Sequence, residues 1–223
     1  MNMNHHFLIC VLSFSLAACG RTGETPEPLP DQLPFFRDAQ LTPEWIDMED
    51  PARDSIHRIP AFALTDQTNL PFTEAGMDGR ICVTNFFFAR CRSICPRMTL
   101  QLKYLSDTLG NATDVRFLSF SVDPEADSAS VLADYAERYG INANTWKLLT
   151  GDRDDIYRLA RRGFFADDST GLTSTSDEFL HTENVILTDR KRRIRGVYNG
   201  TLRVEMDRIF QDIQILRKEQ DSD

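Results

Sequence analysis

The sequence predicts a mixed α/β fold, in which helices cover a sheet within a single domain. Its 223 residues, 41% of them hydrophobic and 26% charged, suit one domain with a sizeable core. From residue 59 onward, segments with the pattern of a strand alternate with segments that have the periodicity of a helix. Two strand segments are almost continuously apolar, which is typical of strands buried on both faces of a sheet.

The expected strands are short runs of β-branched, aromatic and other apolar residues. They cover residues 59–64, 81–88, 115–122, 146–149, 184–187 and 194–198. The polar residues 189–193 between the last two runs predict a hairpin. From residue 81 onward the predicted order is βαβαβαββα, and the sequence contains no internal repeat and no second domain.

Four helices follow from apolar residues at helical spacing. Pro96 suits the first turn of the first helix, where its missing N–H costs nothing. Ser128 begins the second helix and Gly140 ends it. Asp152 is the expected N-cap of the third helix, which runs to Arg162. The fourth helix is C-terminal and has an apolar stripe formed by Met206, Ile209, Ile213 and Leu216.

Composition and motifs exclude several classes of function. A net charge of −9 argues against a nucleic-acid partner, which requires clustered Lys and Arg. Five cysteines are too few for a disulfide scaffold in a chain of this length. The sequence has no phosphate-binding glycine loop, no HExxH, no G-x-S-x-G and no second cysteine pair for a zinc ribbon.

The N-terminal region has the pattern of an export signal. Residues 7–18 are apolar and too short to span a bilayer. They lead into Leu-Ala-Ala-Cys-Gly at 16–20, which resembles a bacterial lipobox, although the preceding residues lack Lys and Arg. We therefore expect a signal peptide over 1–18, lipidation of Cys19 and a membrane-anchored lipoprotein that faces the periplasm, on either membrane. The alternative is an ordinary secretory signal with a chance cysteine.

Residues 19–58 predict an acidic, proline-rich tether that leads to a domain over 59–223. Residues 20–58 contain six of the ten prolines, and nine acidic residues against four arginines. We expect Trp45 to pack on the domain surface and His57 to be solvated.

The sharpest motif is Cys-Arg-Ser-Ile-Cys-Pro at 91–96. Cys91 and Cys95 lie in the turn from a buried strand into a helix, at the strand end where open α/β sheets bind ligands. Free backbone N–H groups there, with Arg90 and Arg92, favour the thiolate form. The pair can hold a soft metal or close reversibly to a disulfide. A purely structural disulfide is the alternative, but so small a loop gains little stability from it.

Three blocks resemble the SCO/SenC copper-chaperone family. They are Asn-Phe-Phe-Phe-Ala-Arg-Cys-Arg-Ser-Ile-Cys-Pro-Arg-Met at 85–98, Ser-Phe-Ser-Val-Asp-Pro-Glu-Ala-Asp at 119–127, and Phe-Leu-His-Thr at 179–182 followed by Ile-Arg-Gly-Val-Tyr-Asn-Gly at 194–200. The resemblance extends from residue 59 to about 216. One departure is Arg92, where the family commonly has proline.

The resemblance implies a thioredoxin-like fold in which Cys91, Cys95 and His181 bind Cu(I) or Cu(II). It implies a metallochaperone whose client is the subunit of cytochrome c oxidase that carries the CuA centre, and a thiol reductant that keeps the cysteines reduced. An enzymatic alternative uses Cys91 and Cys95 as a redox pair in a periplasmic thiol–disulfide reductase. A copper-dependent redox sensor would need the same residues.

Other candidates have competing interpretations. Asp123 either orients a copper ligand from outside the metal site or caps the turn before Pro124. Cys82 and Met98 are expected in the core. The basic hairpin tip at 190–193 is expected to be a solvated turn, with partner docking as the minority alternative.

Overall fold

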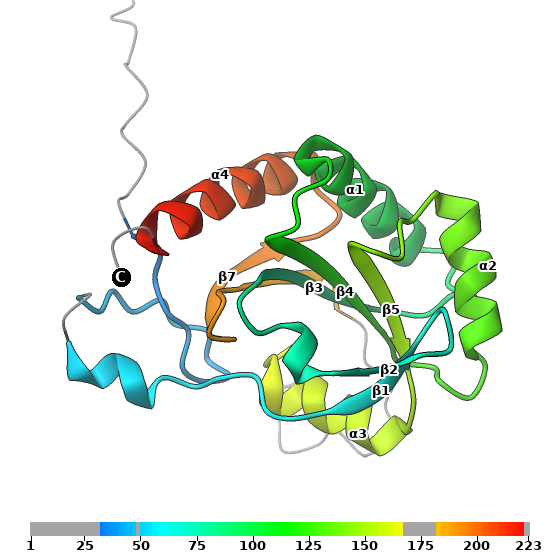
Figure 1. The fold of residues 1–223 in the computed structure, drawn as a ribbon, viewed down its shortest axis with the longest axis horizontal. Coiled ribbons are helices and arrows are strands. Elements are labelled where there is room, and N and C mark those ends of the chain that lie inside the picture. Colours follow the sequence, from blue (N-terminus) through cyan, green and yellow to red (C-terminus); the bar gives the residue numbers. More distant parts are fainter. Residues whose placement is uncertain (1–31, 48–49, 167–181, 221–223) are drawn as a thin grey trace, which may run out of the picture.

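The computed structural model describes residues 32–47, 50–166 and 182–220. Figure 1 shows a twisted sheet with helices on both of its faces. The strands are β1 (Ala63–Asp66), β2 (Pro71–Thr73), β3 (Ile81–Phe87), β4 (Val115–Ser121), β5 (Trp146–Thr150), β6 (Asn184–Thr188) and β7 (Ile194–Asn199). The helices are η1 (Pro51–Ser55), η2 (Glu74–Gly76), α1 (Ile94–Leu109), α2 (Ala129–Tyr139), α3 (Arg153–Arg158), η3 (Leu159–Gly163) and α4 (Arg203–Gln220).

The seven strands form one mixed sheet in the order β2-β1-β5-β4-β3-β6-β7. β3, β4 and β5 are parallel at its centre, and the remaining pairs are antiparallel. The predicted α/β architecture, the buried central strands and the β6–β7 hairpin are therefore confirmed. The predicted first strand is wrong in position, since pairing begins at Ala63, and β2 was not foreseen.

Two cores fill the two faces of the sheet. One contains side chains of α1, α2 and α4, and the other contains side chains of α3 and η3. In β3 every residue is buried, as the apolar run predicts for a strand covered on both faces. Cys82 and Met98 are fully buried, which confirms their assignment to the core.

The expected helix caps are also present. The Ser128 hydroxyl accepts a hydrogen bond from the N–H of Val131, and the Asp152 carboxylate accepts one from the N–H of Asp155. Gly140 ends α2 in the left-handed conformation (φ 63°), which glycine adopts without steric cost.

The part of the expected tether that the structure describes packs against the domain. Residues 32–47 form a strap beside β7 and the end of α4 (Figure 1), and Leu33, Phe35 and Ile46 are buried. Trp45 lines a surface hollow beside Gly196 and Val197 but is 65% exposed, so it packs on the domain surface only in part. Successive side chains of an extended segment point in opposite directions, and Ile46 takes the inward position.

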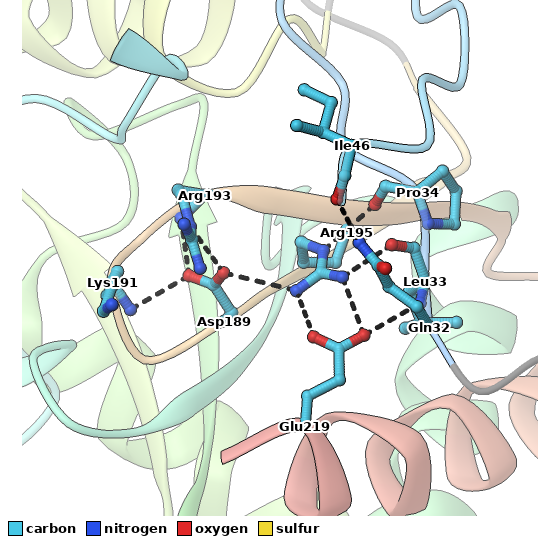
Figure 2. Close-up of polar contacts among 9 residues, drawn as sticks. All are labelled: Gln32, Leu33, Pro34, Ile46, Asp189, Lys191, Arg193, Arg195 and Glu219. Carbon is cyan, nitrogen blue, oxygen red and sulfur yellow. Dashed lines mark hydrogen bonds and ion pairs between the residues drawn. The ribbon is translucent and has the colours of Figure 1, made fainter. Parts of the chain in front are cut away.

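Buried charges hold the strap (Figure 2). The Arg195 guanidinium is 1% exposed and donates to both carboxylate oxygens of Glu219, at 2.7 and 2.8 Å. It also donates to the carbonyl oxygens of Pro34 and Leu33. Glu219 in turn accepts from the Leu33 N–H at 2.8 Å. One ion pair thus joins β7, α4 and the strap.

The hairpin tip is less solvated than its composition suggests. Arg193 is buried and pairs with Asp189 at 2.7 Å, and Arg192 pairs with Asp78 at 3.1 Å. Aromatic contact adds to this, because the Arg193 and Arg195 guanidiniums lie 4.9 and 3.9 Å from the centre of the Phe35 ring. The basic tip is therefore a structural element.

We expect Glu219→Gln to lower the free energy of unfolding by about 3–5 kcal/mol, because it removes one partner of a buried ion pair. Glu44→Gln is the matched control, since its pair with Arg37 is half exposed and should contribute no more than about 1 kcal/mol. Urea unfolding of both variants checks this. Equal effects would show that the buried pair does not hold the strap.

Candidate functional site

The candidate site lies where β3 ends and α1 begins. The turn is closed by a hydrogen bond from the Cys91 N–H to the Phe88 carbonyl at 3.2 Å. Cys91 is partly exposed and Cys95, in the first turn of α1, is 4% exposed. Both are free thiols. The Cys95 thiol is near enough to contribute to lowering the pKa of Cys91, so the two sulfurs lie close together.

The Cys91 sulfur takes the place of a helix cap. Ser93, the N-cap residue of α1, makes no capping hydrogen bond with its side chain. The backbone N–H groups of Ser93, Ile94 and Cys95 lie near the Cys91 sulfur instead and lower its pKa. Anionic groups are stabilised at this end of a helix.

The two thiols have opposite acid–base properties. Burial is the largest influence on Cys91 and raises its pKa, but the hydrogen bonds from the start of α1 and from Cys95 outweigh it, so the pKa lies below its ordinary value of 9.0. Burial, reinforced by the neighbouring Cys91, raises the pKa of Cys95 to about 12. Cys91 is therefore the thiol of the pair that loses its proton first as the pH rises.

Asp123 reaches the cysteine turn from the loop after β4. Its carboxylate is 2.7 Å from Nε of Arg90, which precedes Cys91. Its backbone carbonyl accepts from the N–H groups of Ala126 and Asp127, at 3.1 and 2.9 Å. The backbone of Asp123 thus closes the turn that contains Pro124, while its side chain contacts Arg90 beside Cys91.

Asp127 is a site residue that sequence reasoning missed. It is 1% exposed, and its Oδ2 accepts from the Ala89 N–H at 2.9 Å and from the Ser121 hydroxyl at 2.6 Å. Burial raises the pKa of this carboxyl, and the two hydrogen bonds offset that only in part. Ser121 and Asp127 both lie within the 119–127 block. The polar Ser121 at the end of an apolar strand was the sequence signal that could have indicated a buried polar partner.

The start of β6 lies at the same edge of the sheet as the cysteines. β6 pairs antiparallel with β3, with Val185 opposite Asn85, so its first residues are near the end of β3. Thr182 is 4% exposed and its hydroxyl accepts from the Asn184 N–H at 3.1 Å. The predicted ligand His181 and the predicted lipidation site Cys19 lie outside the described residues.

Among the described residues, no group of three or more His, Cys, Asp or Glu side chains is arranged to hold a metal ion. Cys91 and Cys95 alone thus offer two soft sulfur donors, a set that suits Cu(I). The described part of the chain also contains no helix with the length and hydropathy of a membrane span.

Comparison with known proteins identifies a family. Residues 50–216 match the sequence model of the SCO1/SenC family. The SCO1 protein homolog of Bacillus subtilis is 28% identical over 71% of this chain and 82% of that protein. A Stutzerimonas stutzeri protein named for copper binding is 24% identical over 66% of this chain and 72% of that protein.

A solved structure agrees with the fold. The structure of BsSco, described as a member of the Sco family of cytochrome c oxidase assembly proteins, superposes with a TM-score of 0.61. It is 26% identical, over 72% of this chain and 93% of that chain. The predicted thioredoxin-like fold is therefore confirmed.

Alkylation should distinguish the two thiols. As the pH rises, we expect Cys91 to react with iodoacetamide with a half-maximal rate below pH 9.0, because its lowered pKa provides thiolate there. Cys95, with a pKa of about 12, should stay largely unmodified over that range. Peptide mapping by mass spectrometry measures both, with buried Cys82 as the unreactive control. Equal labelling of the pair would contradict the assignment.

Asp127→Ala should destabilise the domain by about 1–3 kcal/mol, because it leaves the Ala89 N–H without an acceptor. It should also change the rate at which Cys91 is alkylated, since the turn before this thiol loses its support. Asp127→Asn retains an oxygen acceptor and should preserve most of both properties. The exposed Asp134→Ala is the control, and a matching loss there would contradict a specific role for Asp127.

Proposed function

The chain belongs to the SCO1/SenC family, and on this basis we propose that it is a copper metallochaperone. It binds Cu(I) or Cu(II) through Cys91, Cys95 and His181, and delivers the ion to the CuA centre of cytochrome c oxidase. The names of its relatives support both the copper and the oxidase.

The observation that carries the proposal is the contact between two thiols at the start of α1. Thiolates are preferred ligands of Cu(I), and the first turn of α1 stabilises negative charge on Cys91. Copper binding releases the proton of Cys95, because the metal-bound form of a cysteine is the thiolate. The copper cation then compensates the negative charge of the Cys95 thiolate, which burial would otherwise disfavour.

The assignment of His181 as the third ligand is based on its position next to Thr182 in the sequence and on coordination chemistry. Buried Thr182 lies next to His181 in sequence and at the sheet edge that carries the cysteines. An imidazole added to two thiolates gives a donor set that also accepts Cu(II). A client with more ligands can then take the ion by ligand exchange.

The thiol redox state controls loading. A disulfide between Cys91 and Cys95 has no thiolate to offer, so copper binds only the reduced pair. We propose that a thiol reductant maintains this state. Lipidation of Cys19 would hold the domain at a bacterial membrane, facing the periplasm, and intact-mass measurement of the native protein tests that anchor.

A second function is supported by the asymmetry of the pair. An accessible thiol of lowered pKa beside a buried thiol of raised pKa is the arrangement that a thiol–disulfide reductase uses. Cys91 would attack a client disulfide and Cys95 would resolve the mixed disulfide, leaving the client reduced and the pair oxidised. This reaction makes no use of His181.

Copper titration of the reduced full chain separates the two functions. We expect tight one-to-one binding and a thiolate-to-Cu(II) absorption band. In His181→Ala the band should weaken or vanish. The copper affinity should also fall. Loss of a residue that only hydrogen-bonds to a ligand typically costs roughly tenfold to hundredfold in metal affinity, and we expect a larger fall here. His57→Ala is the matched control and should bind as the wild type does.

The opposite result is equally clear. Negligible copper affinity in the reduced wild type, together with efficient reduction of protein disulfides, would reject the chaperone and favour the reductase. Unchanged binding in His181→Ala would remove this residue from the ligand set.

A further inference from the structure

A groove of about 410 Å³ lies between residues 57–62 and the turns of α3 and η3. Its wall residue Leu159 belongs to the core on the opposite face of the sheet from α1, and Figure 1 shows α3 on that face. The residues that matter here are His57, Arg58, Phe62, Arg158, Leu159 and Arg162. The proposed copper function uses none of them.

Positive charge predominates in this groove although the chain carries a net charge of −9. Arg58, Arg158 and Arg162 line it, and Asp155 is the one carboxylate that the described residues contribute. Asp155 pairs with Arg158, and both side chains are largely exposed. Within the described chain, Arg58 and Arg162 form no ion pair. Two guanidiniums thus remain available to an anion.

An apolar wall adjoins the cations. Leu159 is 3% exposed, and the half-buried Phe62 ring is held 5.6 Å from Phe120 and 6.2 Å from Phe72, measured between ring centres. Pro60 and Ala61 continue this wall. An inorganic anion would leave the apolar surface uncovered, whereas an apolar group attached to the anion would bury it.

The groove is preformed. The His57 ring, expected to be solvated, is half-buried, and its Nε2 lies 2.8 Å from the Gly163 carbonyl oxygen. Gly163 fits closely, because a Cβ there would lie 3.0 Å from Pro60. η3 is a π-helical turn, with the Phe164 N–H bonded to the Leu159 carbonyl at 3.0 Å. Such turns are frequent at functional sites.

We propose that this groove binds an amphipathic anion. A phosphate or carboxylate head group is held by Arg58 and Arg162, since a guanidinium donates paired hydrogen bonds to such groups. A small apolar body attached to the head group packs on Phe62 and Leu159. The site is distinct from the copper site and does not depend on it.

Isothermal titration calorimetry of the full chain with phenyl phosphate tests the proposal. We expect saturable one-to-one binding, and binding of inorganic phosphate or phenol at least tenfold weaker than that of phenyl phosphate. The double variant Arg58→Gln/Arg162→Gln should bind phenyl phosphate at least tenfold more weakly. The control Arg37→Gln/Arg97→Gln removes the same charge at exposed positions outside the groove and should bind as the wild type does.

Three results would overturn the proposal: no saturable binding, equal weakening in both double variants, or equal affinity for inorganic phosphate and phenyl phosphate. All four substituted arginines are exposed, so the variants should fold. Copper titration of the groove variant should match the wild type, which distinguishes failure here from failure of the copper function. Competition by vesicles of anionic phospholipid, but not of zwitterionic lipid, would identify a lipid head group as the source; absence of competition would identify a soluble ligand.

Discussion

The stabilisation of negative charge on the Cys91 sulfur by the first turn of α1 is the interaction on which the candidate site depends. The strand-to-helix turn leaves backbone N–H groups without helical partners, and a side-chain oxygen usually accepts them. Here the Cys91 sulfur lies near these groups, and they lower its pKa. The start of one helix therefore also creates an accessible thiol of lowered pKa beside a buried thiol of raised pKa.

The architecture behind that turn follows from how the central strands pair. Because β3 and β4 are parallel, their carboxyl ends meet at one edge of the sheet, which brings Asp123 and Asp127 to the cysteine turn. The antiparallel β6 starts at this edge, so Thr182, just before it, lies there too. Strand pairing thus brings residues about 30 and about 90 positions after the cysteines in sequence to the same edge of the sheet.

Sequence patterns predicted what depends on local order. The apolar runs fixed the central strands, and Ser128 and Asp152 marked helix starts correctly. The pattern could not predict the strap, because Arg195 in a short strand resembles a solvated charge, and its partners Leu33 and Glu219 are distant in sequence. In the same way, Asp127 gains its role only after folding places it under Ala89. A charged side chain that is buried by partners distant in sequence leaves no periodic pattern from which its burial could be predicted.

The strap and the thiols lie at opposite edges of the sheet. Phe36 bridges to Ile194, whose partner Thr188 lies opposite Cys82 near the start of β3, whereas the thiols follow the end of that strand. The polypeptide thus enters the domain on the side remote from Cys91. The strap therefore packs at the edge of the sheet opposite the one that carries the two thiols, so it contributes no residue to the candidate site.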